Sequence, residues 1–303
     1  MLKKGPANIK DVLKTNSASN KWIDKDWSGN STYVDTYTSS TDKTAFDNGF
    51  KNYGYYFGNV RSVFPNANIF DADGNPEFTE PRQGGIGDCY FIQSVSGVAE
   101  FPQLIRNLFL TTSFNDAGII GVQFFIRGKP WVVTIDEQFL LNTQLSSKLV
   151  AANIDVNNEA LWVPIIEKAW AKVKGNYYRA GGGGFGVEGI RALTGAPGFS
   201  YTNSKIDTSG NPTLAETFTA MKNANSLKYI MSAGTSAGSD TTYNSCGIPF
   251  GHAYSIVEAF TLTDASGTTQ SMIMARNPWG SSAGVYNGTW NNADSLWTTA
   301  TVA

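Results

Sequence analysis

The chain has 303 residues, of which 41% are hydrophobic and 16% are charged, and its formal net charge is −2. This length can bury a substantial core and predicts about two domains or lobes. The near-neutral charge gives no electrostatic footprint for nucleic acid or for an anionic membrane surface. No apolar run approaches the roughly 20 residues of a spanning helix, so we expect no membrane span.

Cysteine and histidine are scarce, with two cysteines and one histidine in the chain. Two cysteines are too few for a disulfide scaffold, which fits a reducing compartment. A single histidine also makes a Cys₂His₂ zinc site impossible. The first twenty residues carry lysines without a hydrophobic region behind them, so no signal peptide is visible. We therefore expect a cytoplasmic protein, although a mature secreted chain would look the same.

The first half of the chain predicts a polar arm, a loop, a helix and a hairpin. Residues 1–45 are rich in Asn, Ser, Thr, Asp and Lys, which predicts an extended or poorly ordered arm. Turn residues fill 71–85. From Cys89 onward, apolar residues recur at helical spacing, so a helix is expected to begin there. Segments 119–126 and 131–135 predict a β-hairpin.

The strongest helix prediction covers residues 159–175, with Pro164 in the first turn and Gly175 at the end. Its apolar stripe consists of Trp162, Ile165, Ile166, Ala169, Trp170 and Val173. Four glycines at 181–184 follow, and either a lobe boundary or an ordinary long turn would suit them. Strands are predicted at 228–232, 252–259 and 270–276. Helices first and strands later indicate an α+β fold in two lobes.

The last two predicted strands flank residues 264–267, which have strong turn chemistry. If they form a hairpin centred between residues 264 and 265, His252 lies opposite Asn277, with Cβ atoms ~5 Å apart. The asparagine oxygen could then accept from the imidazole and fix its tautomer. A one-residue slip would separate the two side chains, and His252 could equally satisfy a half-buried strand position.

The stretch QGGIGDCY places Cys89 where a glycine-rich loop meets a helix. The helix dipole and a neighbouring imidazolium would lower the thiol pKa toward the reactive thiolate. Gln83 could offer its amide to a developing oxyanion, together with the backbone N–H of Cys89. A lone cysteine is more often a small buried hydrophobe, but these residues lie at element ends, where catalytic groups usually sit. We predict that Cys89 is the nucleophile and that Cys246 is structural.

Six segments resemble the calpain family, in the order that the family has them. QGGIGDCY resembles the motif around the calpain nucleophile, GHAYSI (251–256) the histidine box, and RNPWG (276–280) the asparagine box. LWVPIIEKAWAKVKGNYY, GGGGFGVEGIRALTG and YNGTWNNADSLW (286–297) resemble the helix, the glycine-rich lobe junction and the tryptophan-bearing segment of calpain cores. The likeness runs from about residue 60 to the end.

The resemblance implies a papain-like, two-lobe calpain protease core with an α+β fold. A helical lobe (46–182) would bear the nucleophile, and a β-rich lobe (183–303) would bear the histidine and asparagine. Protein or peptide substrates would lie in the cleft between the lobes. The C-terminal domains of the larger calpains have no counterpart here, which leaves room for additional domains beyond this chain.

The resemblance also implies a role for each site residue in a cysteine endopeptidase. Cys89 would attack the scissile carbonyl, and His252 would hold the ion pair and then protonate the leaving amine. Asn277 would orient His252, Gln83 would help to stabilise the oxyanion, and Trp279 would shield the His–Asn pair from water.

Animal calpains are gated by calcium, and the resemblance therefore raises the question of calcium ligands. Gly74, Glu80 and Glu159 are weak candidates for one site, with Glu159 displaced by one residue. The second site needs acids after the asparagine box, where this chain has no carboxylate before Asp294. We expect that no cofactor is required and regard calcium gating as doubtful.

Two alternative functions stay open. Acyl transfer to an amine, as in transglutaminases, uses the same cysteine–histidine chemistry, but Asn277 in place of Asp and Gln83 upstream disfavour it. A catalytically silent, papain-fold binding module has usually lost the cysteine or the histidine, whereas this chain keeps both Cys89 and His252.

Overall fold

The structure is a computed structural model that describes residues 16–17, 19–27, 40–154, 157, 159–201, 213–281 and 284–298. Its elements, in chain order, are η1 (Lys25–Trp27), α2 (Ser40–Asn52), β1 (Tyr55–Asn59), α3 (Val60–Val63), α4 (Cys89–Ala99), α5 (Pro102–Arg106), β2 (Ile119–Ile126), β3 (Lys129–Asp136), β4 (Gln138–Asn142), α6 (Trp162–Lys174), α7 (Tyr177–Ala180), α8 (Gly186–Thr194), α9 (Leu214–Ser226), β5 (Met231–Gly234), β6 (Ala253–Thr263) and β7 (Thr269–Arg276). Among these helices, none is long and apolar enough to cross a membrane.

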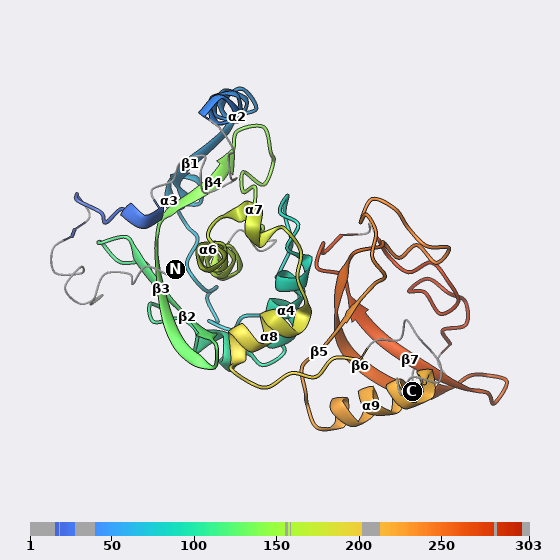
Figure 1. Cartoon of the computed structure of the whole chain (residues 1–303). Coiled ribbons are helices and arrows are strands. Elements are labelled where there is room, and N and C mark those ends of the chain that lie inside the picture. The colour runs from blue at the N-terminus through green and yellow to red at the C-terminus, as the bar shows by residue number, and fades with distance from the viewer. Residues whose placement is uncertain are drawn as a thin grey trace.

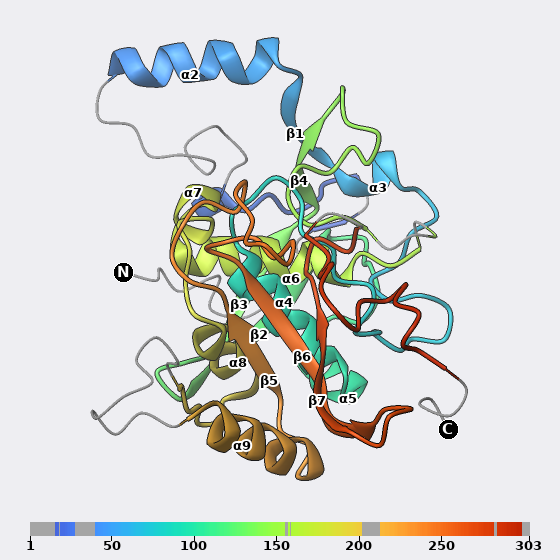
Figure 2. The same cartoon turned by 90° about the vertical axis from the view of Figure 1, so that its right-hand side faces the viewer.

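The fold is α+β, as predicted, with most helices before the largest sheet. Helices α4, α6 and α8 pack with the β2–β3 pair on one side of the molecule, and the antiparallel sheet β5–β6–β7 lies beside them (Figure 1). Strands β5 and β6 contact α4 directly, and they cross over it in Figure 2. The first residue of α4 therefore lies next to the sheet.

The buried core is built around α4 and α6. The apolar stripe predicted for residues 159–175 is confirmed, because the side chains from Trp162 to Trp170 are buried and the helix ends at Gly175 with φ +108°. The indole of Trp170 stacks on the ring of Phe91 from α4, with centroids 4.7 Å apart and planes 3° apart. Burial of each such large side chain stabilises the fold by about 1.5–3 kcal/mol, so α4 is held firmly on α6.

The predicted hairpin at 119–126 and 131–135 is confirmed as β2 and β3. The turn is shorter than the sequence indicated, because Ile126 pairs with Lys129 and only two residues connect the strands. Arg127 and Gly128 both have positive φ, 53° and 74°, which is the backbone geometry of a type I′ turn.

The predicted register of the last hairpin is wrong by three residues near the turn and by two at the open end. The turn is centred on Ser266 instead of between 264 and 265, because the Asp264 side chain accepts from the backbone N–H groups of Ser266 and Thr268. A bulge between Ile256 and Glu258 then moves the register back by one residue. Near its open end, the hairpin accordingly pairs Ser255 with Arg276. His252 comes just before β6 and Asn277 comes directly after β7, so both lie beyond this last pair.

The described part of the predicted polar arm is anchored to the body. Trp27 is buried edge-to-face against Tyr177, with ring centroids 5.9 Å apart. Asp24 forms an ion pair with Lys172 of α6. Residues 40–45 of the predicted arm belong to α2. Residues 1–15, 18 and 28–39 of the arm lie outside the described residues.

The glycine run at 181–184 connects α7 to α8. Helix α8 packs against α4 and β2 and also reaches β5. Since α8 touches both parts of the molecule, the predicted lobe boundary at 182/183 stays a prediction.

Candidate active site

Cys89 is the first residue of α4 and faces the start of β6. The helix begins there because the Asp88 carbonyl accepts the backbone N–H groups of Phe91 and Ile92. The thiol is free and partly buried, and the backbone N–H of Ala253 is near enough to lower its pKa. Ala253 directly follows His252, so the helix N-terminus brings the thiol beside the histidine-bearing segment.

His252 and Asn277 lie at hydrogen-bond distance, as predicted, although not by the predicted register. The Nε2 atom of His252 is 2.9 Å from Oδ1 of Asn277. Oδ1 also accepts from the backbone N–H of Trp279, at 3.0 Å, and Nδ2 donates to the Gly284 carbonyl, at 3.2 Å. Because these two bonds fix the orientation of the amide, Oδ1 faces the imidazole and Nε2 carries the proton.

The other imidazole nitrogen, Nδ1 of His252, has no hydrogen-bond partner within the described ranges. His252 itself is only 2% exposed. The indole of Trp279 covers its ring, with centroids 4.3 Å apart and planes inclined by 38°. The tautomer fixed at Nε2 therefore leaves Nδ1 as a proton acceptor in a site largely closed to water.

Burial determines the charge state of the thiol and the imidazole. It raises the pKa of Cys89, and the nearby Asp88 carboxylate raises it further. The backbone N–H groups of Ala253 and Tyr90 lower this pKa, as expected at a helix N-terminus, but by less than burial raises it. The predicted net lowering is therefore wrong for this structure. Burial also lowers the pKa of His252, so burial favours the neutral form of both the thiol and the imidazole.

Gln83 lies in the loop that leads to α4 and is 8% exposed. Its Nε2 donates to the Ile86 carbonyl at 2.6 Å. Its backbone N–H donates to the Pro278 carbonyl at 2.9 Å. Because Pro278 follows Asn277, this bond joins the loop before the cysteine to the segment that carries the asparagine.

Sequence reasoning missed Arg276, which forms a second connection between the same two segments. One guanidinium nitrogen donates to the carbonyls of Thr79 and Pro81, at 2.6 Å each. The other donates to the hydroxyl of Ser96 on α4, at 3.2 Å. The only signal in the sequence is that Arg276 stands directly before Asn277.

The three weak calcium candidates each accept hydrogen bonds from the protein. The Gly74 carbonyl accepts from the guanidinium of Arg106. Glu80 accepts from the Trp162 indole at 2.8 Å and from a backbone N–H at 2.7 Å, and the Glu159 carbonyl accepts from a backbone N–H. Across the described ranges, no three His, Cys, Asp or Glu side chains are grouped as metal ligands.

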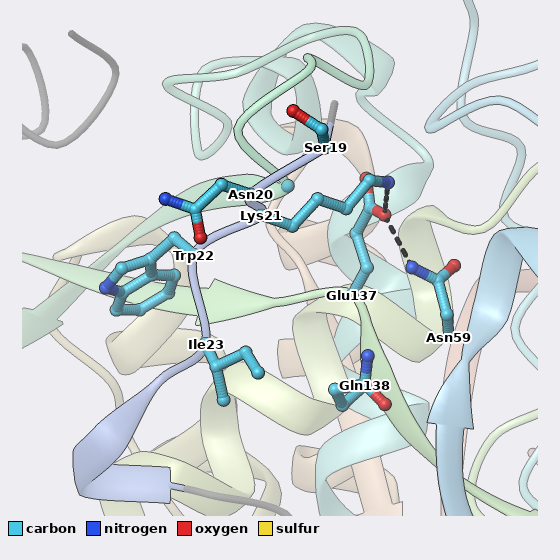
Figure 3. Close-up of a pocket in the computed structure, with 9 residues that line it drawn as sticks. Ser19, Asn20, Lys21, Trp22, Ile23, Asn59, Glu137 and Gln138 are labelled. Carbon is cyan, nitrogen blue, oxygen red and sulfur yellow. Dashed lines mark hydrogen bonds and ion pairs between the residues drawn. The ribbon is translucent and has the colours of Figure 1, made fainter. Parts of the chain in front are cut away.

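A cavity of about 340 Å³ lies away from this site (Figure 3). It is bounded by residues 19–23, by Asn59 and by the segment after β3. There Glu137 accepts from Asn59 at 3.0 Å and forms an ion pair with Lys21. None of the candidate catalytic residues lines this cavity, so the cavity takes no part in the site. The ion pair between Lys21 and Glu137 holds the N-terminal segment there.

Comparisons with known proteins show the family of the chain. Residues 61–302 match the family described as calpain family cysteine protease. The chain is 28% identical over 230 residues to the calpain-type cysteine protease DEK1 of Arabidopsis thaliana, covering 76% of this chain and 10% of that protein. It is 29% identical over 263 residues to the human calpain-2 catalytic subunit, covering 83% of this chain and 35% of that protein. The chain thus spans about a third or less of these relatives.

The loop that carries Gln83 depends on a glycine at the next position. A Cβ atom at Gly84 would lie 1.7 Å from the Ala151 carbonyl oxygen. We expect Gly84→Ala to lower the free energy of unfolding by about 1–3 kcal/mol, the usual cost of overpacking, in urea unfolding. Gly49→Ala is the control, because a Cβ there meets nothing within 4 Å; it should not destabilise the α2 helix. Equal stability of Gly84→Ala and the wild type would contradict the close approach.

Proposed function

Because the chain belongs to the calpain family of cysteine proteases, we propose that it is a cysteine endopeptidase that hydrolyses peptide bonds in protein substrates. The observation that carries the proposal is the His252–Asn277 hydrogen bond at the start of β6, where the next residue, Ala253, is near enough to the Cys89 thiol for its backbone N–H to lower the thiol pKa. A base with a fixed tautomer beside a thiol at a helix N-terminus is the arrangement that nucleophilic acyl transfer needs.

Because burial favours the neutral thiol and the neutral imidazole, proton transfer accompanies attack in the proposed reaction. The thiol proton of Cys89 passes to Nδ1 of His252 as the sulfur forms a bond to the scissile carbonyl carbon. The imidazolium then gives this proton to the leaving amine as the C–N bond breaks. Water, deprotonated by the same imidazole, hydrolyses the resulting thioester and regenerates the thiol. Asn277 holds the imidazole through both steps, and Trp279 excludes water from its ring.

The oxyanion of the tetrahedral intermediate would form near two donors. One is the backbone N–H of Cys89 at the start of α4, and the other is the side-chain amide of Gln83. The Gln83 amide has two N–H groups, of which one is used by the Ile86 carbonyl. The second remains for the oxyanion.

The activity is expected to depend on Cys89 and not on Cys246. Cleavage of a casein-type substrate should vanish in Cys89→Ser. Cys246→Ser should cleave at the wild-type rate, because the bonds of Cys246 to Asn244 and Asn287 use its backbone atoms and not its thiol. The reverse pattern would identify Cys246 as the nucleophile. Incorporation of an amine into the substrate without cleavage would favour the transglutaminase-like reaction instead, and a folded chain that does neither would favour the silent binding module.

Asn277→Ala tests the orienting role separately from folding. The variant frees the imidazole and removes a bond that raises the pKa of His252. We expect kcat to fall by at least about tenfold, since part of the general acid–base contribution is lost, with the thermal unfolding midpoint near that of the wild type. An unchanged kcat would rule out the orienting role.

We also propose that the peptidase needs no calcium. The support is that the candidate ligands Gly74 and Glu80 already bond to Arg106 and Trp162. Casein cleavage should proceed at equal rates in excess chelator and in millimolar calcium. A rate that rises only on addition of calcium would contradict this proposal and would leave the peptidase assignment in place.

A further inference from the structure

Two buried carboxyl groups lie together beneath the start of α4, and the proposed reaction uses neither. Asp88 directly precedes Cys89 and is 0% exposed, and Glu167 on α6 is 1% exposed. The two side chains are within hydrogen-bond reach of each other. Asp88 occupies the N-cap position of α4, yet its side chain makes no capping bond to the helix.

Among the described residues, no protein donor compensates the two carboxyl groups at the point where they meet. Neither carboxylate oxygen of Asp88 has a hydrogen-bond donor in the described part of the chain, and Oε1 of Glu167 has none either. The neighbouring Lys168 is committed to Asp136. Two ionised carboxylates in contact would repel each other in a buried site. A proton between them removes one charge and supplies the missing donor.

We propose that Asp88 and Glu167 share a proton, and that this bond positions the Cys89 helix and the Gln83 loop for the proposed peptidase. The positioning of catalytic residues thus rests on the proposed function, whereas the shared proton does not. Asp88 and Glu167 are positioning residues, since neither is placed to touch a substrate.

The pair reaches the site by two routes. The first route is Asp88 itself, because its carbonyl accepts the first backbone N–H groups of α4 and Cys89 is the next residue. Through Glu167 the pair holds the Ala152 backbone N–H, at 2.6 Å. The segment around Ala152 in turn holds the loop before the cysteine, because Gly85 N–H donates to Val150 and Asn153 N–H donates to Arg82. The nucleophile and the oxyanion loop therefore share one support.

The electrostatic surroundings favour the protonated pair. Burial raises the pKa of Asp88 to about 7 and raises that of Glu167 well above its usual value. The titratable groups that face the pair are Cys89 and Tyr90 on α4 and Tyr177 on α7, and none of them is a cation. The folded chain thus holds protons that the unfolded chain releases above about pH 4. Stability from this pair is greatest in acid and is lost as the pH rises from about 4 through 7.

The test compares Glu167→Gln with the wild type. A glutamine can accept from Ala152 N–H and donate to the Asp88 carboxylate, so it keeps both bonds with no proton to lose. We expect the thermal unfolding midpoint of the wild type to fall more steeply from pH 5 to pH 8 than that of Glu167→Gln. Glu188→Gln, at a solvent-exposed ion pair with Lys174, is the control and should follow the wild type. Parallel curves for the wild type and Glu167→Gln would overturn the shared proton.

The positioning role has its own readout in hydrogen exchange. At pH 6, peptides covering residues 82–92 and 149–154 should exchange on the order of tenfold faster in Glu167→Ala, which loses a buried hydrogen bond. They should exchange at the wild-type rate in Glu167→Gln. Exchange at the wild-type rate in Glu167→Ala would overturn the positioning role.

Casein cleavage then separates this inference from the proposed function. At pH 6, it should fall on the order of 100-fold in Glu167→Ala, because a small displacement of a catalytic group is costly, and persist in Glu167→Gln. If the wild type cleaves nothing, the proposed function fails, while the unfolding and exchange data still decide the shared proton and the positioning.

Discussion

The docking of α4 against β6 is the contact on which the whole site depends. Cys89 is the first residue of α4, and β6 begins directly after His252. The two residues therefore come together only when the helix packs against the strand. The Ser255 hydroxyl on β6 donates to the Gln93 carbonyl on α4 at 2.8 Å. Arg276 and the bond from Gln83 to Pro278 fasten the ends of the same interface. Buried hydrogen bonds of this kind contribute about 1 kcal/mol each, and their larger effect is to fix geometry.

Burial is the common cause of the electrostatic features around this contact. It raises the pKa of Cys89 and lowers that of His252, so it favours the neutral form of both groups. It also favours protons on Asp88 and Glu167 directly below. A site without resting charges costs less to bury, and charge then develops only as the reaction proceeds. The helix N-terminus and the fixed imidazole are placed where this charge would form.

Local sequence signals predicted α4, α6 and the strands β2, β3, β5, β6 and β7, but not α2, α9 or the β1–β4 pair, and not the details of the site. The stripe from Trp162 to Trp170 and the turn chemistry around Gly267 predicted α6 and the last hairpin. The predicted register failed because side-chain bonds of Asp264 set the turn and a bulge at Val257 shifts the pairing, and periodicity reveals neither. His252 and Asn277 still meet, since the loops beyond the paired strands bring them together. The pairing of Asp88 with Glu167 and the reach of Arg276 follow from packing between distant segments, which no spacing reveals.

The central claim is that Cys89 is a nucleophile activated by His252, and covalent labelling tests it most directly. A peptidyl epoxide that traps active cysteine proteases would be added to the folded wild type and to His252→Ala, and the adducts would be located by intact and peptide mass spectrometry. We predict one adduct on the wild type, at Cys89, and none on the variant. An adduct at Cys246, or no adduct on folded wild-type protein, would contradict the claim.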